Sequence, residues 1–176
     1  APNPLSNRIL VTLGGDDSHN LALDIMKALL DSNQPFHADV VASAPNSGYI
    51  LSKKLAASVP ECFTVHRAPV KLAPLMARAM VTICGGGVTA IEAASLGVPS
   101  VILALSENQV PGASALAAKG VAFMVKPQKR FVIIATELAL EFLKDEKKRA
   151  DFSQRSLGLV DGKGSSRVFE ALNQDR

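Results

Sequence analysis

Apolar and polar positions alternate along the chain in blocks that are typical of an α/β protein. Short runs rich in Val, Ile, Leu and Ala suit strands that are buried on both faces of a sheet. They lie at residues 8–13, 38–42, 62–65, 81–84, 101–103 and 121–125. Because helical segments separate these runs at spacings of roughly 20 residues, the pattern predicts right-handed βαβ units. We therefore expect a Rossmann-like α/β fold with a doubly wound parallel sheet of about six strands.

The segments between these runs carry apolar residues at the spacing of amphipathic helices. In the first segment Leu21, Ile25 and Leu29 fall on one helical face. Breaker and turn residues bound the helices, which we expect at about 21–31, 46–58, 69–79, 88–96, 113–119 and 131–143, with two short ones at about 146–157 and 165–173. The charged run 144–149 is typical of a solvated helix face; peripheral contact with an anionic membrane surface or a partner is the alternative.

A glycine-rich segment in the middle of the chain carries most of the information about function. The strand 81–84 is followed by Gly85, Gly86 and Gly87, and an alanine-rich helix then begins at Val88 or Thr89. A helix N-terminus after a glycine turn at the carboxyl end of a strand can bind an anion, usually a phosphate. Glu92, one turn into the helix, could accept hydrogen bonds from a sugar diol. The alternative is a tight turn that binds no ligand.

Two further polar loops are expected at the same edge of the sheet as the glycine turn. Ligands of doubly wound sheets bind beyond the carboxyl ends of the strands, where the loops 14–20, 85–89 and 104–112 converge. His19 in the first of them could touch a phosphate, or it could face solvent. We expect His37 and His66, which flank strands, to be structural.

Composition and charge narrow the classes of function. The chain has 176 residues, a hydrophobic content of 48% and a net charge of +3, which suits an anionic small ligand but is no dense basic patch for nucleic acid. Its two cysteines have no metal-ligand spacing and are interpreted as reduced core thiols, consistent with the cytoplasm. We assign no catalytic residue, no metal and no bound cofactor. The absence of G-x-G-x-x-G followed by an acid argues against a dinucleotide-dependent oxidoreductase.

The first residues differ in character from the rest of the chain. Residues 1–7, Ala-Pro-Asn-Pro-Leu-Ser-Asn, have the composition of a linker. We expect a single nucleotide-sugar-binding domain over residues 8–176, cut from a longer protein. A processed terminus is the alternative.

Three motifs together resemble a known family. They are the Gly-Gly-Asp-Asp of 14–17 after the first strand, the segment 83–100 around the three glycines, and Ser-Glu-Asn-Gln at 106–109. Their order and spacing are similar to those of the C-terminal domain of GT-B proteins. The sequence is most similar to the UDP-sugar hydrolase of pseudaminic acid biosynthesis and related spore-coat polysaccharide proteins, and more distantly to the UDP-GlcNAc transferase that makes lipid II. The resemblance covers residues 8 to about 172.

This resemblance implies that the chain is half of an enzyme of cell-surface glycan or nonulosonic acid biosynthesis. In the family, a UDP-sugar lies between two Rossmann-like halves, and the N-terminal half carries the catalytic histidine. The chain would then be the C-terminal half and hold no complete active site. With an N-terminal domain it would hydrolyse, or transfer from, a UDP-linked amino sugar. The alternatives are half of a split or two-domain glycosyltransferase, and a non-catalytic nucleotide-binding domain.

The resemblance also assigns roles to individual residues. The family positions that meet the pyrophosphate are Gly85, Gly86, Gly87, Val88 and Thr89. The remaining family positions are Glu92 for the ribose hydroxyls, Asn108 and Gln109 for the sugar, Val70 for uracil, and Gly14, Gly15 and Asp16 along the interdomain cleft.

The chain departs from the family pattern at two of its positions. Met80 stands where the family usually has Asp, and Val88 stands where it usually has Ser. The loss of the hydroxyl at Val88 removes one potential phosphate donor.

Overall fold

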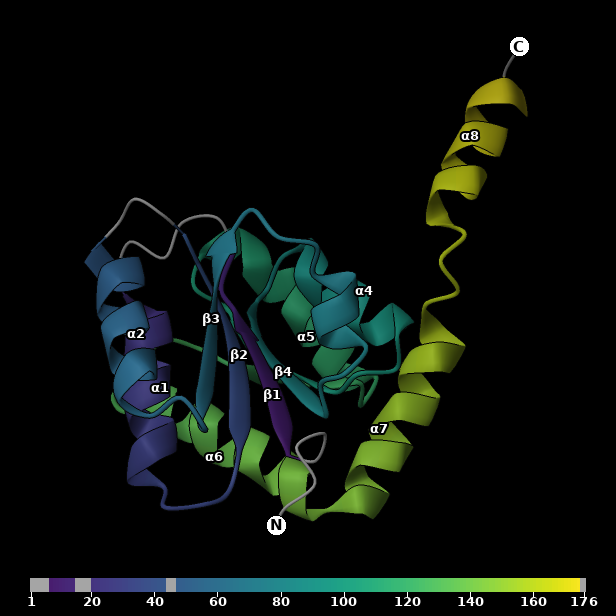
Figure 1. Ribbon diagram of the computed structural model, residues 1–176. Helices are drawn as coiled ribbons and strands as arrows, with labels where there is room; N and C mark the ends of the chain where they lie inside the picture. The colour runs from purple at the N-terminus through teal and green to yellow at the C-terminus, as the bar shows by residue number, and fades with distance from the viewer. Residues whose placement is uncertain (1–6, 15–19, 44–46, 175–176) are drawn as a thin grey trace.

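The computed structural model describes residues 7–14, 20–43 and 47–174, shown in Figure 1. These residues form a six-stranded parallel sheet with the order β3-β2-β1-β4-β5-β6. The strands are β1 (Arg8–Thr12), β2 (His37–Ser43), β3 (Phe63–Ala68), β4 (Val81–Gly85), β5 (Ser100–Leu103) and β6 (Ala122–Val125). The order reverses between β1 and β4, as in Rossmann-like doubly wound sheets. The predicted fold class is therefore confirmed.

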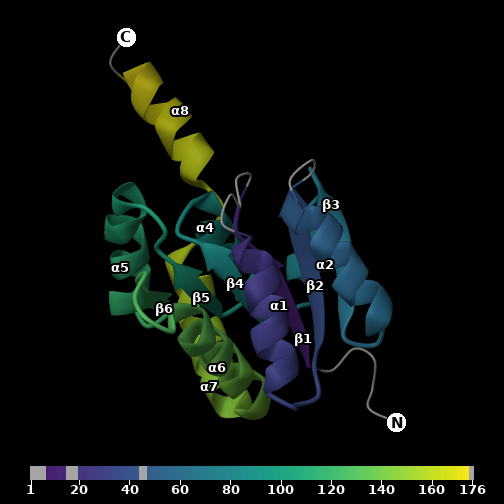
Figure 2. The same cartoon turned by 90° about the vertical axis from the view of Figure 1, so that its left-hand side faces the viewer.

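Helices cover both faces of the sheet, as Figures 1 and 2 show. One face carries α1 (Leu21–Asp31), α2 (Ser47–Ser58) and α6 (Phe131–Lys144). The other carries α3 (Ala73–Met76), α4 (Val88–Ser95) and α5 (Val110–Ala118). Two further helices, α7 (Glu146–Leu159) and α8 (Gly164–Gln174), end the chain, and α7 packs against α4 and α6.

The core lies on both sides of the sheet because successive strand residues point to opposite faces. In β1, Ile9 and Val11 pack in the cluster that includes α1 and α6, whereas Leu10 packs with α3 and α4. All three side chains are fully buried. Burial on both faces explains why the strands have continuous apolar runs instead of an alternation of apolar and polar residues.

The helix predicted over 69–79 is wrong in length, since α3 spans only Ala73–Met76. Pro74 lacks a backbone N–H and fits only the first turn of a helix, so α3 begins beside it. Val70 and Leu72 before it pack against the cluster that contains Leu10 and Met76. The segment therefore follows the face of the sheet before its single helical turn.

The loop predicted over 104–112 is also shorter in the structure. A 3-10 turn, η1 (Glu107–Gln109), leads directly into α5, which begins at Val110. Pro111 occupies the first turn of α5, where its missing N–H costs no helical hydrogen bond. The proline that was interpreted as part of a loop is thus a helix-starting residue.

The charged run 144–149 is not simply a solvated face. Lys148 lies 2.6 Å from the carboxylate of Glu141 and 4.8 Å from the centre of the Phe123 ring. Arg149 donates to the backbone carbonyls of Phe142 and Leu143. Because these carbonyls end α6 without helical partners, Arg149 caps α6 and joins it to α7.

The last helix, α8, projects away from the rest of the domain (Figure 1). Its apolar side chains are exposed: Val168 by 61%, and Phe169 and Leu172 by 69% each. Among the described residues, no helix combines the length and the apolar character needed to cross a membrane.

Candidate functional site

The carboxyl ends of β1 and β4 lie side by side at the point where the strand order reverses. Thr12 pairs with Cys84, so the residues that follow both strands share one edge of the sheet. The chain continues to α1 on one face of the sheet and to α4 on the other, the arrangement at which ligands of doubly wound sheets usually bind. At Gly85 a Cβ atom would lie 3.2 Å from the carbonyl oxygen of Leu13. The close approach of the two loops therefore favours glycine at this position.

Gln109 holds the glycine turn to the next loop. Its side-chain oxygen accepts hydrogen bonds from the backbone N–H groups of Gly86 and Leu105, both at 3.1 Å. A Cβ atom at Gly86 would lie only 2.9 Å from the Cβ of Gln109. The loops after β4 and β5 are thus packed together, as their predicted convergence requires.

The outer side of the glycine turn is open. Gly87 is the exposed N-cap of α4, no described atom lies within 4 Å of its Cβ position, and no described side chain caps the helix. Val88 is 70% exposed and Thr89 is half-buried. Uncapped N–H groups in the first turn of a helix can donate to an anion, and the helix dipole favours negative charge there.

The carboxylate predicted beside this turn lies on the solvent side of α4. Glu92 is exposed, one turn beyond Val88, while Ala90, Ala93 and Ala94 form the buried face. The Glu92 side chain is therefore accessible to solvent, one turn from the start of α4.

The other predicted site residues lie at different places on this edge. Asn108 is exposed and accepts a hydrogen bond of 2.6 Å from Ser106, while Val70 is half-buried against the α3 cluster. Gly14 follows β1 with a φ of +97°, a left-handed conformation that favours glycine. Gly15, Asp16 and His19 lie outside the described residues.

An apolar cavity of about 310 Å³ adjoins the glycine turn. Its walls include Gly86, Gly87 and Ile91 on one side and Leu116 and Leu159 on the other. A larger hollow of about 860 Å³ lies between α1 and α6, and the predicted site residues are not among those that line it. The size of a cavity is a weaker indicator of a binding site than a convergence of polar groups, so the glycine turn remains the candidate site.

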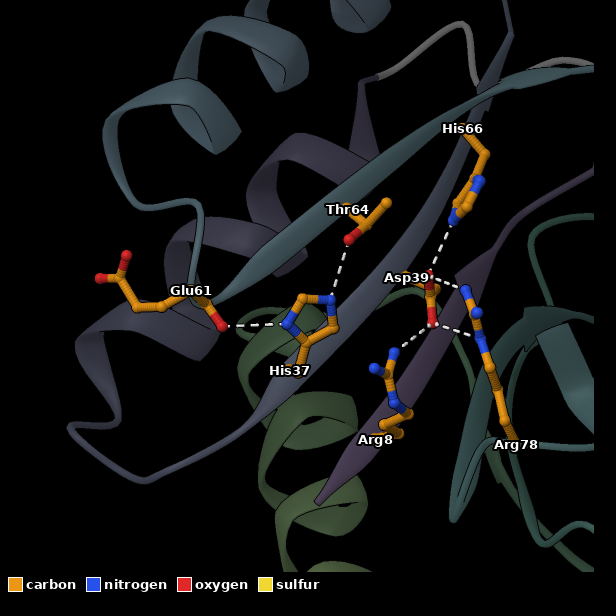
Figure 3. A network of polar contacts seen from close by, with 7 residues as sticks. All are labelled: Arg8, His37, Asp39, Glu61, Thr64, His66 and Arg78. Atoms are coloured by element: carbon orange, nitrogen blue, oxygen red, sulfur yellow. Dashed lines mark hydrogen bonds and ion pairs between the residues drawn. The ribbon is translucent and has the colours of Figure 1, made fainter. Parts of the chain in front are cut away.

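A second polar cluster, which the sequence interpretation missed, surrounds Asp39 (Figure 3). Asp39 is 2% exposed and accepts hydrogen bonds from Arg8, His66 and Arg78. Burial by itself would raise the pKa of Asp39, but the hydrogen bonds from His66 and Arg78 outweigh it and hold the pKa below its ordinary value. A single Asp within the apolar strand 38–42 was the available signal, because a buried carboxylate requires partners.

In the described region, the two histidines make hydrogen bonds within the fold and the two cysteines form no disulfide. His66 contacts Asp39, and His37 contacts the Glu61 carbonyl and the Thr64 hydroxyl. Both cysteines are free thiols; burial raises the pKa of Cys84 to about 12. Within 7–14, 20–43 and 47–174, no three His, Cys, Asp or Glu side chains gather as a metal site.

Comparison with known proteins finds solved structures with a similar fold. No protein family and no curated protein matches the sequence. Among solved structures, MurG of Acinetobacter baumannii is similar with a TM-score of 0.76 and 18% identity, over 96% of this chain and 52% of MurG. A calicheamicin glycosyltransferase is similar with a TM-score of 0.70 and 18% identity, over 98% of this chain and 45% of that protein. The UDP-GlcNAc 2-epimerase of Neisseria meningitidis, solved with UDP-GlcNAc, has a TM-score of 0.65 and 20% identity, over 96% and 44%.

The lengths of these structures show how much of each one this chain matches. The chain spans about half the length of the solved structures that it matches. Its fold is that of one Rossmann-like half of a GT-B protein. At these identities the likeness shows the fold alone.

Proposed function

We propose that this chain is the nucleotide-binding half of an enzyme that acts on a UDP-linked amino sugar. The observation that carries the proposal is the glycine turn at the switch between β1 and β4. The side-chain oxygen of Gln109 accepts a hydrogen bond from Gly86 in this turn, and the turn leads into the uncapped start of α4. This arrangement would present the backbone N–H groups at the start of α4 to a diphosphate. Lys119, which lines the adjoining cavity, is a basic side chain near the turn.

The neighbouring side chains favour a nucleotide over a simple phosphate. Glu92 offers two carboxylate oxygens on the exposed face of α4, a suitable acceptor pair for the two ribose hydroxyls, and such charge-assisted bonds are worth roughly 1.5–3 kcal/mol each. Val70 lies two residues beyond the end of β3, at the carboxyl edge of the sheet, where its backbone would face the base. Asn108 and the amide nitrogen of Gln109 would reach the sugar.

The reaction itself would need a second, N-terminal Rossmann-like half. The chain spans only 52% of MurG and 44% of the epimerase. The exposed apolar residues of α8, Val168, Phe169 and Leu172, form a face that such a half would cover. We therefore assign nucleotide binding to this chain and the catalytic groups to the other half, in one parent chain or as a separate subunit.

Three outcomes for the parent protein follow from this assignment. The resemblance of the glycine segment favours a hydrolase of cell-surface glycan or nonulosonic acid biosynthesis. The similarity to a calicheamicin glycosyltransferase favours transfer instead. A chain that binds UDP with no activity in any pairing would be a non-catalytic nucleotide-binding domain.

Titration of the isotope-labelled chain with UDP, UDP-GlcNAc and NAD, followed by backbone amide shifts, tests the proposal. We expect both uridine ligands to shift the amides of Gly86 to Thr89, and NAD to leave them unchanged. Glu92→Ala should weaken UDP by about 10- to 100-fold, or ~1.4–2.8 kcal/mol. Glu107→Ala is the control because it removes an equal, exposed charge from the same edge. No uridine-dependent shift at millimolar ligand would reject the proposal.

A further inference from the structure

We propose that Asp39 is a positioning residue for the segment 69–77, which lies between β3 and β4 and carries Val70. The inference rests on the proposed function, because its consequence is the recognition of the base of a nucleotide. Asp39 itself lies in β2, away from the glycine turn, and it would act through its hydrogen-bond partners.

The contacts of Asp39 lie on both sides of this segment along the chain. Oδ1 of Asp39 accepts from Nε2 of His66 at 2.7 Å and from the guanidinium of Arg78 at 2.6 Å. His66 lies in β3, two residues before the strand ends, and Arg78 directly follows the segment, three residues before β4 begins. A single carboxylate oxygen therefore joins the last part of β3 to the residue that follows the segment (Figure 3).

The other oxygen fixes the same carboxylate to the centre of the sheet. Oδ2 accepts from Nε of Arg78 at 3.1 Å and from a guanidinium nitrogen of Arg8 at 3.2 Å. Arg78 thus binds both oxygens, in the bidentate geometry that gives Arg–carboxylate pairs their directionality. Arg8 lies in β1 and Asp39 in the neighbouring β2, so the hydrogen bond between them fixes the carboxylate that Arg78 binds.

The apolar contacts of the segment do not supply this directionality. Leu72, Leu75 and Met76 pack on Leu10 and Val41 and keep the segment on the sheet. Apolar burial is favourable in many similar arrangements because it depends on area and not on angle. The four hydrogen bonds of the buried Asp39 carboxylate depend on angle and therefore favour one arrangement of the segment.

This arrangement separates two parts of the proposed ligand site. The glycine turn is held by Gln109, which does not contact the Asp39 cluster among the described residues. The segment with Val70 is held by Asp39. Loss of the Asp39 charge should therefore disturb the contact with the base and leave the contact with the diphosphate intact.

Calorimetric titration of the wild-type chain and of Asp39→Asn with UDP, ADP and inorganic pyrophosphate tests this separation. We expect Asp39→Asn to weaken UDP by about 10-fold and to remove most of the preference for UDP over ADP, while pyrophosphate binds as in the wild type. Asp24→Asn is the matched control, since it removes an exposed carboxylate that pairs only with Lys27 among the described residues. Arg78→Gln, at a side chain that is 40% exposed, repeats the test if Asp39→Asn does not fold.

The outcomes distinguish this inference from the proposed function. A folded Asp39→Asn or Arg78→Gln chain with the wild-type ratio of UDP to ADP affinity would overturn the positioning role. An equal loss of UDP and pyrophosphate affinity would overturn it as well, because it would indicate a general structural effect. A wild-type chain that binds none of the three ligands would instead reject the proposed function.

Discussion

The side-chain oxygen of Gln109 accepts a hydrogen bond from the backbone N–H of Gly86, although 23 residues separate them. The same oxygen also accepts from Leu105, so one amide group joins the loops that follow β4 and β5. Gln109 is half-buried at this point. Its structural role is therefore to hold the glycine turn, and any contact of its amide nitrogen with a sugar would be additional.

Removal of the Gln109 side chain should destabilise the domain and loosen the turn. Gln109→Ala leaves two backbone donors without their acceptor, so we expect a loss of about 1–3 kcal/mol in the free energy of unfolding. Urea denaturation measures it. Asn108→Ala is the control, because exposed Asn108 bonds only to Ser106 among the described residues, and it should change stability by less than about 0.5 kcal/mol. Equal stabilities of the two variants would contradict the anchoring role of Gln109.

Alanine at two adjacent glycines should separate folding from ligand binding. At Gly86 a Cβ would lie 2.9 Å from the Cβ of Gln109, so Gly86→Ala should lower the unfolding free energy by about 1–3 kcal/mol. At Gly87 the Cβ would meet open space and φ is −91°, so Gly87→Ala should fold, with a loss of no more than about 1 kcal/mol because Ala is a poorer N-cap than Gly. If that space receives the diphosphate, the added methyl group should weaken UDP by at least about 10-fold, or ~1.4 kcal/mol.

Thermal unfolding and UDP titration of the two glycine variants provide the measurement. Wild-type UDP affinity of Gly87→Ala, in a chain that does bind UDP, would place the phosphates elsewhere. Wild-type stability of Gly86→Ala would show that the two loops separate more easily than their packing indicates.

Acid should weaken the domain partly through Asp39. Despite its burial, hydrogen bonds from His66 and Arg78 hold the pKa of Asp39 below the ordinary value of 3.8. In the range between the two pKa values the unfolded chain binds more protons than the folded one, so stability rises with pH there. The contribution of Asp39 is therefore complete above about pH 5 and is lost as pH falls through its folded pKa.

Urea denaturation of the wild type and Asp39→Asn at several pH values tests this sign. Breaking a buried ion pair costs about 3–5 kcal/mol, so Asp39→Asn should be less stable by about 3 kcal/mol at pH 6. The difference should shrink steadily below pH 4. A stability difference that stays constant down to pH 2 would show that the titration of Asp39 does not contribute.

The chain's own pattern was sufficient to predict the layers of the fold. The six strands and the helices between them were predicted because strands buried on both faces need continuous apolar runs, and helices need a 3.6-residue period. Two prolines account for the differences in length. Pro74 and Pro111 stand in the first turns of α3 and α5, whereas the sequence predicts a helix that already begins at 69 and a loop that extends to 112. Whether a proline starts a helix or interrupts one depends on what packs around it, and a local pattern does not report that.

Some features of the candidate site were also predictable from the sequence, and others were not. The glycine turn and the position of Glu92 after it are local features, and the sequence alone determined that they follow a buried strand, at the carboxyl edge of the sheet. Tertiary structure alone decided that Gln109 anchors Gly86 and that Asp39 joins His66 to Arg78. These partners lie 23, 27 and 39 residues apart along the chain. Periodicity and propensity indicate whether each residue faces solvent or the core. Hydrogen-bond partners at such separations come within reach only when the strands pair, so a local pattern does not predict them.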